Sequence, residues 1–368
     1  NTRRNKIKLM KKISNQLAVV VLFWNDSGKT INCLKSLFQQ QKQKFDIILV
    51  DNNSDQKYSK KILEWLKRKK IKFSRIKSNN ISRTKNINKQ LFYIRNKINY
   101  GCGLGHNSGY KFCLKNKYDY IARIDNDMFV PKDLMYQLVK RLENNKFISA
   151  ISPKVMFATN PNIIWFGGTK IGNNLKLQRE CSNHICKKID SKKFKGLIKT
   201  DAIVGCASIM RSEFLKQAGL SDPDFFYGEE DIELSHRFKK IGGELFIDLD
   251  QKIYHSVSHT VGTNWAKSIY YNYKYRLLLI NKIGSATDKF FGYSIFVIKF
   301  FIMILFSFRN KYSSKLVQIF YAGLHFIQKK YGHYDRKKYK LINKFFFRID
   351  KKTSIRDVIY ILNSKNKI

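Results

Sequence analysis

The sequence predicts an α/β fold in which parallel strands of one sheet alternate with helices. Leu17 to Phe23 is a continuous apolar run rich in valine, which is typical of a strand buried on both faces. A helical pattern follows through Phe38, and a second apolar strand, Ile47 to Val50, precedes a helix with Ile62, Trp65 and Leu66 turned inward. Ligands of such sheets bind outside the carboxyl ends of the strands.

Further elements follow in the same alternation. A polar stretch over residues 74–89 suggests an insertion before a short strand, Leu91 to Arg95. A glycine-rich segment over residues 99–109 is expected to be a loop, whose glycines allow close approach to a ligand at the start of the next helix. The apolar run Tyr120 to Ile124 is the next strand. Beyond it we expect helices over 131–142, 211–218 and 232–241, and strands over 148–155, 203–210 and 245–247.

The charge of the chain favours an anionic partner without naming it. The 368 residues include 71 Lys and Arg against 27 Asp and Glu, a formal net charge of +44. Nucleic acid, anionic lipid headgroups and phosphorylated substrates all fit such a surface. Lys, Asn and Ile are all abundant, as in proteins of A+T-rich genomes, so part of the charge reflects composition. The basic residues are spread along the chain without a recognised nucleic-acid motif, and we do not expect nucleic acid as the partner.

Six cysteines are scattered along the chain, which favours a reducing cytoplasm. Cys181, His184 and Cys186 have a spacing that resembles half of a zinc site, but no matching second half follows, so we interpret this segment as a surface loop. The basic residues 1–16 lack the apolar core of a signal peptide and form an amino-terminal arm.

The composition becomes aromatic and basic after about residue 264. Residues 290–308 contain a single charge, Lys299, and approach the length of about 20 residues that a membrane-spanning helix needs. Shallow membrane insertion, a full span and a soluble helix all remain open, and the surrounding Lys and Arg favour the first. The sequence thus predicts three parts: the arm over residues 1–16, a globular domain over 17–262, and a helical, aromatic and basic region over 263–368, for which membrane association is one of the interpretations.

Two acidic clusters are conspicuous in this basic chain. Asp125 and Asp127 follow the strand Tyr120 to Ile124, and strand alternation turns their carboxylates to the same side. Such a pair can hold one divalent cation that also accepts diphosphate oxygens. The second cluster, Gly228 to Leu234, precedes a helix. The simpler alternatives are an ordinary loop start for the first cluster and a favourable helix amino terminus for the second.

Taken in order, several motifs resemble those of inverting family 2 glycosyltransferases of GT-A fold, and most closely the rhamnosyltransferase and galactofuranosyltransferase-like group. The resemblance covers about residues 17–260 and implies a Rossmann-like mixed sheet with helices on both faces. The motifs are Val-Leu-Phe-Trp-Asn at the first strand, Val50-Asp51-Asn52-Asn53-Ser54, Asn99-x-Gly101, Asn107-x-Gly109, Asp125-x-Asp127, Gly167-Gly168 and Glu230-Asp231.

The resemblance implies a donor site and a metal site. Asp51 and Asn52 match the place where such enzymes bind the base and ribose of the donor, and Asn107 lies where the nucleotide sugar is cradled. Asp125 and Asp127 match the pair that holds Mg²⁺ or Mn²⁺ on the donor diphosphate. Asp51 could instead cap the following turn.

The resemblance also implies an acid pair for catalysis. Asp231 would be the general base, with Glu230 beside it, and the amino terminus of the following helix helps to keep it charged. His255 matches a histidine that completes the metal site in some relatives, with His259 as the substitute, although a structural histidine is the alternative. Glu233 replaces an Asp that is common two positions after the base.

The sequence therefore predicts a glycosyltransferase at the inner face of the cell membrane, peripheral and cytoplasmic. Its donor would be a UDP-, dTDP- or GDP-sugar, its acceptor a surface glycan or polyprenyl-linked oligosaccharide, and its surface would contact anionic lipid. A nucleic-acid-binding protein, a metal-dependent nucleotidyltransferase and an inactive scaffold protein are the competing interpretations.

Overall fold

The computed structural model describes residues 16–77, 91–171, 180–181, 186–256, 265–309 and 313–332. The chain divides into two compact units, one of residues 1–171 with 179–257, the other of residues 172–178 with 258–368. The predicted boundary at residue 262 lies outside the described residues, as do almost all of the predicted arm, the predicted insertion after residue 77, His184 and His259.

The first unit is built on one mixed sheet, as the sequence predicts. Its strands run in the order β11-β13-β7-β12-β5-β1-β2-β4-β3. The strands from β5 to β3 pair in parallel, whereas β12 is antiparallel to both β5 and β7. These strands are β1 (Leu17–Phe23), β2 (Phe45–Asp51), β3 (Phe73–Lys77), β4 (Leu91–Arg95), β5 (Tyr120–Asp125), β7 (Ile148–Phe157), β11 (Leu197–Lys199), β12 (Ala207–Arg211) and β13 (Glu244–His255).

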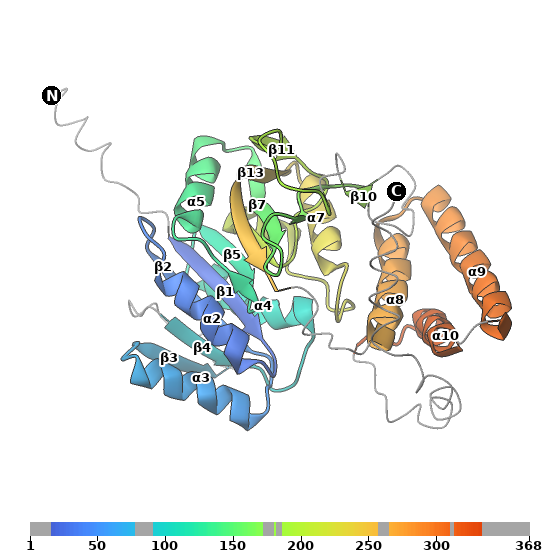
Figure 1. Ribbon diagram of the computed structural model, residues 1–368, viewed down its shortest axis with the longest axis horizontal. Coiled ribbons are helices and arrows are strands. Elements are labelled where there is room, and N and C mark those ends of the chain that lie inside the picture. Colours follow the sequence, from blue (N-terminus) through green and yellow to red (C-terminus); the bar gives the residue numbers. More distant parts are fainter. Residues whose placement is uncertain are drawn as a thin grey trace. The chain divides into compact units, whose positions relative to one another are not determined.

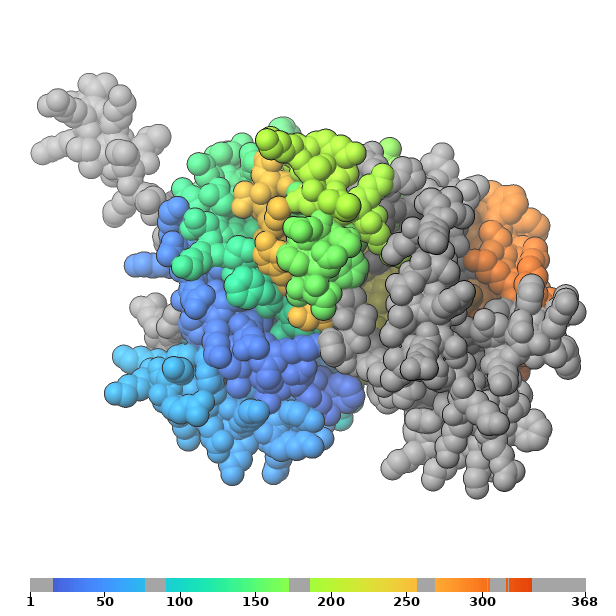
Figure 2. Space-filling model, in the orientation of Figure 1, coloured from blue at the N-terminus to red at the C-terminus, as the bar shows by residue number. Residues whose placement is uncertain are grey.

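Short strands extend this sheet at its periphery. β6 (Met128–Phe129) pairs with β13, and β8 (Ile164–Phe166) pairs with β7. β9 (Thr169–Lys170) and β10 (Glu180–Cys181) form a separate ribbon. In the space-filling view, residues of β13 (yellow-orange) reach the surface among green segments from the middle of the chain (Figure 2).

Helices cover both faces of the sheet (Figure 1). Successive residues of β1 alternate between two cores: Val19 and Val21 belong to one, Ala18 and Val20 to the other. The first core includes residues of α2 (Ser27–Phe38), α3 (Gln56–Arg68) and α5 (Leu134–Asn144), and the second includes residues of α4 (Cys102–Lys115), α6 (Ser212–Ala218) and α7 (Glu230–Lys240). This division follows from the two-residue period of a strand whose faces are both covered.

The register places the polar strand ends at one edge of the sheet. β1 lies between β2 and β5, with Phe23 opposite Asp51 and Leu22 opposite Asp125. Because the three strands are parallel, both aspartates lie at the same carboxyl edge, where α/β folds bind their ligands.

The glycine-rich segment differs from its prediction. We expected a loop through Gly109, but α4 already begins at Cys102. A Cβ on Gly105 would lie 2.9 Å from the methyl carbons of Leu22, and one on Gly109 would lie 2.4 Å from a methyl carbon of Val20. These glycines therefore let a helix pack closely on β1, and a close approach to a sheet, not to a ligand, explains them.

Other boundaries also differ from those expected. α5 begins at Leu134 instead of Pro131, and β12 begins at Ala207 instead of Ile203. β13 does not end at Ile247 but continues to His255, because its second part pairs with both β7 and β6 after an irregularity between Asp248 and Lys252. Pairing partners from distant parts of the chain set the limits of the two strands.

Three helices make up the described part of the second unit: α8 (Trp265–Ile283), α9 (Ala286–Arg309) and α10 (Ser313–Ile327). Lys274 of α8 is fully buried, with its ammonium group 4.6, 5.7 and 4.6 Å from the ring centroids of Tyr270, Tyr271 and Tyr275. Its Nζ also donates to the carbonyl oxygen of Gly332 (3.2 Å). Burial lowers the pKa of Lys274 to about 7, while the tyrosine faces favour the charged form.

In the described part of the chain, no helix combines the length and the apolar content needed to cross a bilayer.

Candidate functional site

Asp127 and His255 meet at the carboxyl edge of the sheet. His255, the last residue of β13, lies opposite Met128 of β6, and the backbone N–H of Ser256 donates to the carbonyl oxygen of Asp127 (3.1 Å). This pairing brings His255 Nε2 within 3.2 Å of Asp127 Oδ1. The ring of Trp165 packs against the imidazole edge at a centroid distance of 4.8 Å. The sequence-predicted pair is therefore assembled by a strand contact.

The imidazole of His255 holds its proton strongly in the absence of a cation. Burial alone would lower its pKa, but Cys206 and the hydrogen bond to Asp127 outweigh burial and raise the pKa of His255 to about 11. A metal ion at Asp127 would have to displace that proton, because a ligating imidazole is neutral.

Asp125 lies beside this pair in a different environment. Burial raises the pKa of Asp125 to about 7, although the neighbouring Arg123 opposes the shift. His106 Nε2 is 3.8 Å from Asp125 Oδ1, and His106 Nδ1 lies 2.9 Å from the carbonyl oxygen of Cys102. The two aspartates of the motif thus have unlike surroundings.

The donor set fits a hard divalent cation only in part. Within the described ranges, no set of three or more His, Cys, Asp or Glu side chains converges as a metal site. Asp127 and His255 nevertheless offer an oxygen and a nitrogen donor 3.2 Å apart, and the carboxylate oxygen is the donor type that suits Mg²⁺ and Mn²⁺. A cation there would take most of its ligands from water or from a bound anion.

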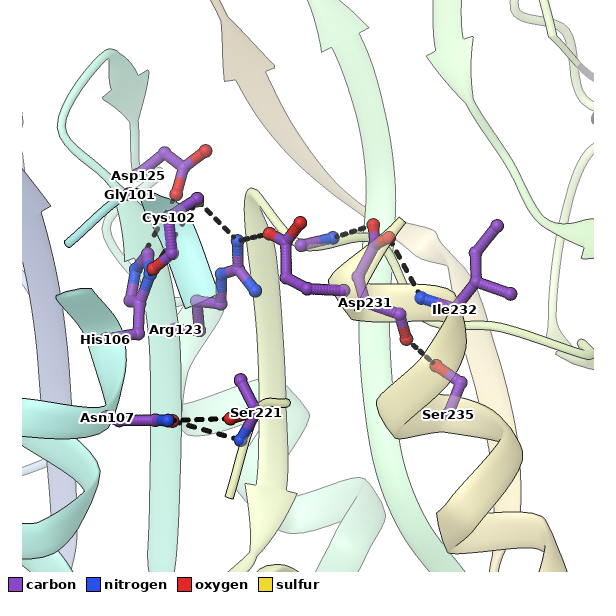
Figure 3. Close-up of polar contacts among 12 residues, drawn as sticks. Gly101, Cys102, His106, Asn107, Arg123, Asp125, Ser221, Asp231, Ile232 and Ser235 are labelled. Carbon is purple, nitrogen blue, oxygen red and sulfur yellow. Dashed lines mark hydrogen bonds and ion pairs between the residues drawn. The ribbon is translucent and has the colours of Figure 1, made fainter. Parts of the chain in front are cut away.

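Asp231 lies in the first turn of α7, in contact with the segment just before β12. Its Oδ1 accepts from the backbone N–H of Ile232 and its Oδ2 from that of Gly205, each at 2.9 Å. Its carbonyl oxygen accepts from Ser235 Oγ (2.6 Å; Figure 3). Gly205 directly precedes Cys206, whose carbonyl oxygen accepts from the backbone N–H of Asp125 (2.9 Å). Asp231 is therefore held next to the carboxyl end of β5.

Glu230 points inward, unlike Asp231. Its Oε1 pairs with Nη2 of Arg123 at 2.9 Å, and both side chains are only 4% exposed. The same Nη2 lies 3.1 Å from Cys102 Sγ. Arg123 was not among the predicted site residues, although a single basic residue inside the apolar strand Tyr120–Asp125 was a signal that could have identified it.

Asp51 is fully buried and surrounded by protein donors. Its Oδ2 accepts from Ser59 Oγ (2.6 Å), Tyr93 OH (2.5 Å) and Arg95 Nη1 (2.6 Å), and its Oδ1 accepts from the backbone N–H of Ser54 (2.7 Å). This arrangement favours the turn-capping interpretation, and the donor-binding role of Asp51 stays a prediction.

The side chain of Asn52 is likewise hydrogen-bonded to other protein groups. Its Nδ2 donates to Asn99 Oδ1 and to the carbonyl oxygen of Gly101, both at 2.8 Å, and its Oδ1 accepts from Asn96 Nδ2 (3.0 Å). These bonds join the turn after β2 to the turn before α4, so the motif asparagines shape the sheet edge from within.

Asn107 fastens α4 to the segment that leads to α7. Its Nδ2 donates to the carbonyl oxygen of Ser221 (2.8 Å), and the backbone N–H of Ser221 donates back to its Oδ1 (3.0 Å; Figure 3). Nearby, Cys102 N–H donates to the carbonyl oxygen of Phe226 (2.6 Å). Gly101 has φ +83°, and a Cβ there would lie 2.1 Å from that oxygen, so glycine is required for this contact.

The cysteines give mixed support to the expected reducing compartment. Cys33, Cys102, Cys113 and Cys206 are free thiols. Cys186, however, is disulfide-bonded, which the expectation of a reducing cytoplasm did not include.

Comparison with known proteins agrees with the fold described above. The family model described as glycosyl transferase family 2 matches residues 18–217, more than half of the chain. No match was found among curated proteins.

Solved structures of glycosyltransferases resemble the chain at low identity. The structure of GalNAc-T7 with UDP, GalNAc and Mn²⁺ has a TM-score of 0.51 and 20% identity, over 67% of this chain and 44% of that chain. This chain thus corresponds to less than half the length of that protein. The structure of S. aureus TarS 1-349 has a TM-score of 0.46 and 13% identity, over 74% of this chain and 67% of that chain. The first likeness supports the GT-A fold.

The contacts of Asp51 yield a stability prediction. We expect Asp51→Asn to lower the free energy of unfolding by about 3 kcal/mol, because breaking a buried ion pair leaves Arg95 without its carboxylate. This is the low end of the usual range, since Arg95 is partly exposed. Tyr93→Phe, which removes a single hydrogen bond to the same oxygen, should cost only about 1 kcal/mol. Urea unfolding of both variants measures the difference. Unchanged stability of Asp51→Asn with weakened nucleotide binding would instead favour the donor role.

Proposed function

Because the chain belongs to glycosyl transferase family 2, whose model matches residues 18–217, we propose that it transfers a sugar from a nucleotide-sugar donor to an acceptor hydroxyl with inversion. The observation that carries this proposal is the carboxylate of Asp231, held by two backbone N–H groups beside the carboxyl end of β5. Asp127, whose carboxylate pairs with His255, follows the end of the same strand.

In this reaction Asp231 is the general base. The acceptor oxygen attacks the anomeric carbon as the bond from that carbon to the diphosphate oxygen breaks, and the hydroxyl proton passes to the Asp231 carboxylate. Attack from the face opposite the leaving group inverts the configuration. The bonds from Ile232 and Gly205 hold the carboxylate in one orientation, which favours transfer by keeping the accepting oxygen in place.

The residues that would hold Mg²⁺ or Mn²⁺ are Asp127 and His255, with Asp125 beside them. When bound, such a cation neutralises negative charge on the departing diphosphate. The structure of GalNAc-T7 contains UDP and Mn²⁺, and this analogy supports a divalent cation and a nucleotide donor here. Among the described residues Asp127 and His255 offer few ligands, so diphosphate oxygens of the donor would complete the coordination of such a cation.

A nucleotide-release screen tests the proposal. Purified protein is incubated with UDP-, dTDP- and GDP-sugars, Mn²⁺ and a crude extract of lipid-linked glycans in detergent, with and without chelator. Metal-dependent release of one nucleoside diphosphate, greater with the extract than without it, is the expected result. In a parallel reaction with nucleoside triphosphates, release of diphosphate would indicate a nucleotidyltransferase. No release from any donor would favour a scaffold or a nucleic-acid-binding protein.

We further propose that α9 attaches the protein to the anionic inner face of the cell membrane, near a surface-glycan or polyprenyl-linked acceptor. Large apolar side chains are exposed near the start of the helix and again from Val297 onward, at spacings that place them along one stripe, and Lys282, Lys289 and Lys299 are close in sequence. The exposed residues are Phe290, Phe291, Val297, Ile298, Phe301 and Ile302. An apolar stripe with flanking lysines suits a helix lying at the lipid interface, and the net charge of +44 complements anionic headgroups.

Replacement of the proposed base gives a direct prediction. Asp231→Asn should lower kcat by about 10²- to 10⁴-fold, because an amide cannot accept the hydroxyl proton, while donor affinity stays unchanged. Glu213→Gln is a matched control, since Glu213 is also an acid in the first turn of a helix. Steady-state transfer and nucleotide binding are measured for both variants. Full turnover of Asp231→Asn would remove Asp231 from the reaction.

Removal of the cation should abolish turnover, and the Mn²⁺ concentration needed to restore turnover should depend on pH. Chelator is expected to stop transfer and excess Mn²⁺ to restore it, whereas Asp127→Asn should respond weakly to Mn²⁺.

Because His255 has a pKa of about 11 and must lose its proton to bind a cation, lower pH opposes binding. The Mn²⁺ concentration for half-maximal activity should therefore rise by about tenfold for each unit of decrease from pH 8. Activity insensitive to chelator and to Asp127→Asn would contradict a metal-dependent mechanism.

The α9 stripe predicts binding to anionic vesicles. Ile298→Ser and Phe301→Ser should each reduce co-sedimentation with phosphatidylglycerol vesicles by about tenfold, because inserting one large apolar side chain contributes about 1.5–3 kcal/mol. Phe147→Ser is the control, since Phe147 is 77% exposed but lies between α5 and β7. Equal binding by all three variants would contradict a membrane role of the stripe. A dimer in detergent-free buffer that the two α9 substitutions dissociate would instead assign the stripe to a second copy of the chain.

A further inference from the structure

Arg123 is a buried cation in the middle of the central sheet. It lies in β5, two residues before Asp125, and only 4% of its side chain is exposed. A guanidinium stays protonated in proteins, so its burial is costly unless an anion and hydrogen-bond acceptors surround it. Ile121, two residues earlier on the same face of this strand, is apolar and buried, so packing of the sheet does not by itself call for a charge at this position.

The guanidinium contacts two segments from distant parts of the sequence. Nη2 lies 2.9 Å from Glu230 Oε1, in the first turn of α7, and 3.1 Å from Cys102 Sγ, at the start of α4. Gly205, before β12, borders the same group: a Cβ there would lie 2.8 Å from Nη2 and 3.0 Å from Cζ. Arg123 therefore lies where α4, α7 and the start of β12 meet (Figure 3).

Two of these neighbours also determine the position of Asp231. Glu230 directly precedes Asp231 in α7, and the backbone N–H of Gly205 donates to Asp231 Oδ2 (2.9 Å). A shift of the Arg123 side chain would therefore move the carboxylate through its neighbour in sequence and through its hydrogen-bond donor. Displacements of about 1 Å at a reacting group can cost about 100-fold in rate.

We propose that Arg123 is a positioning residue for the transfer reaction, which fixes the Asp231 carboxylate relative to the strand end at Asp125 through Glu230 and Gly205. The inference rests on the proposed role of Asp231 as general base. One strand then sets both parts of the site, because Asp125 ends the strand that carries Arg123. Glu230 acts through Arg123 and does not contact the substrate.

The test compares Arg123→Met, Glu230→Met and the double variant. Each single variant leaves one buried charge unpaired and should unfold at a lower temperature, whereas the double variant should regain much of the lost stability, because an apolar pair can replace a buried ion pair. We expect kcat to fall by about 100-fold in all three variants, with the donor KM within threefold of the parent. Lys154→Met is the control, since Lys154 of β7 is a buried lysine whose ammonium group pairs with the carboxylate of Asp190 (2.6 Å).

Several outcomes would overturn the proposal. If the double variant regains kcat together with its melting temperature, Arg123 serves stability alone. If the losses of the single variants multiply in the double variant, Glu230 acts independently of Arg123. If Lys154→Met lowers kcat equally at a temperature where it is folded, the effect is general. Should Arg123→Met not fold, Arg123→Lys, which keeps the charge but loses the planar fork, should show an intermediate kcat at unchanged donor KM; a kcat equal to that of the parent would count against positioning.

A second comparison separates this inference from the proposed function. In an Asp231→Asn background, Arg123→Met should change kcat by less than threefold, because it acts through the missing base. A further 100-fold loss would mean that Arg123 acts by another route. If Asp231→Asn leaves turnover unchanged, Asp231 is not the general base. The inference about Arg123 then fails as well, whatever the effect of Arg123→Met.

Discussion

The buried ion pair between Arg123 and Glu230 joins the two halves of the candidate site. One partner lies in β5, the strand that ends at Asp125, and the other in the first turn of α7, beside Asp231. Because both side chains are almost fully buried, neither charge can move to solvent without a large cost. The pair therefore links a strand from the parallel part of the sheet to a helix more than one hundred residues later in the chain.

Around this pair, most polar residues of the sheet edge bind other parts of the protein. Asp51 accepts four hydrogen bonds from protein groups, Asn52 bridges two turns, and Asn107 holds the backbone of Ser221. Their geometry suggests a frame that keeps the carboxyl edge rigid. The groups proposed to face the substrates are fewer, namely Asp127 with His255, and Asp231. A rigid frame with few reacting groups agrees with catalysis by positioning and charge.

Much of the fold was predictable from local patterns. The Val-rich run of β1, the inward Ile62, Trp65 and Leu66 of α3, and the strand before Asp125 all appear as expected, because buried parallel strands and amphipathic helices have distinctive periods. The glycines of α4 were misinterpreted as a loop, since the sequence cannot show that Leu22 and Val20 lie against them. β13 was predicted too short for a similar reason: its second part is defined by pairing with β6 and β7.

The sequence by itself determined the alternation of strands and helices, the acidic clusters and the motifs that suggested the family, because these depend on residue order and spacing alone. Only the tertiary structure decided which of those residues meet. It paired His255 with Asp127 through β6, turned Glu230 toward Arg123 and away from Asp231, and enclosed Asp51 among protein donors. Such contacts join residues far apart in the chain, and their geometry follows from strand register and side-chain packing, which local sequence patterns do not specify.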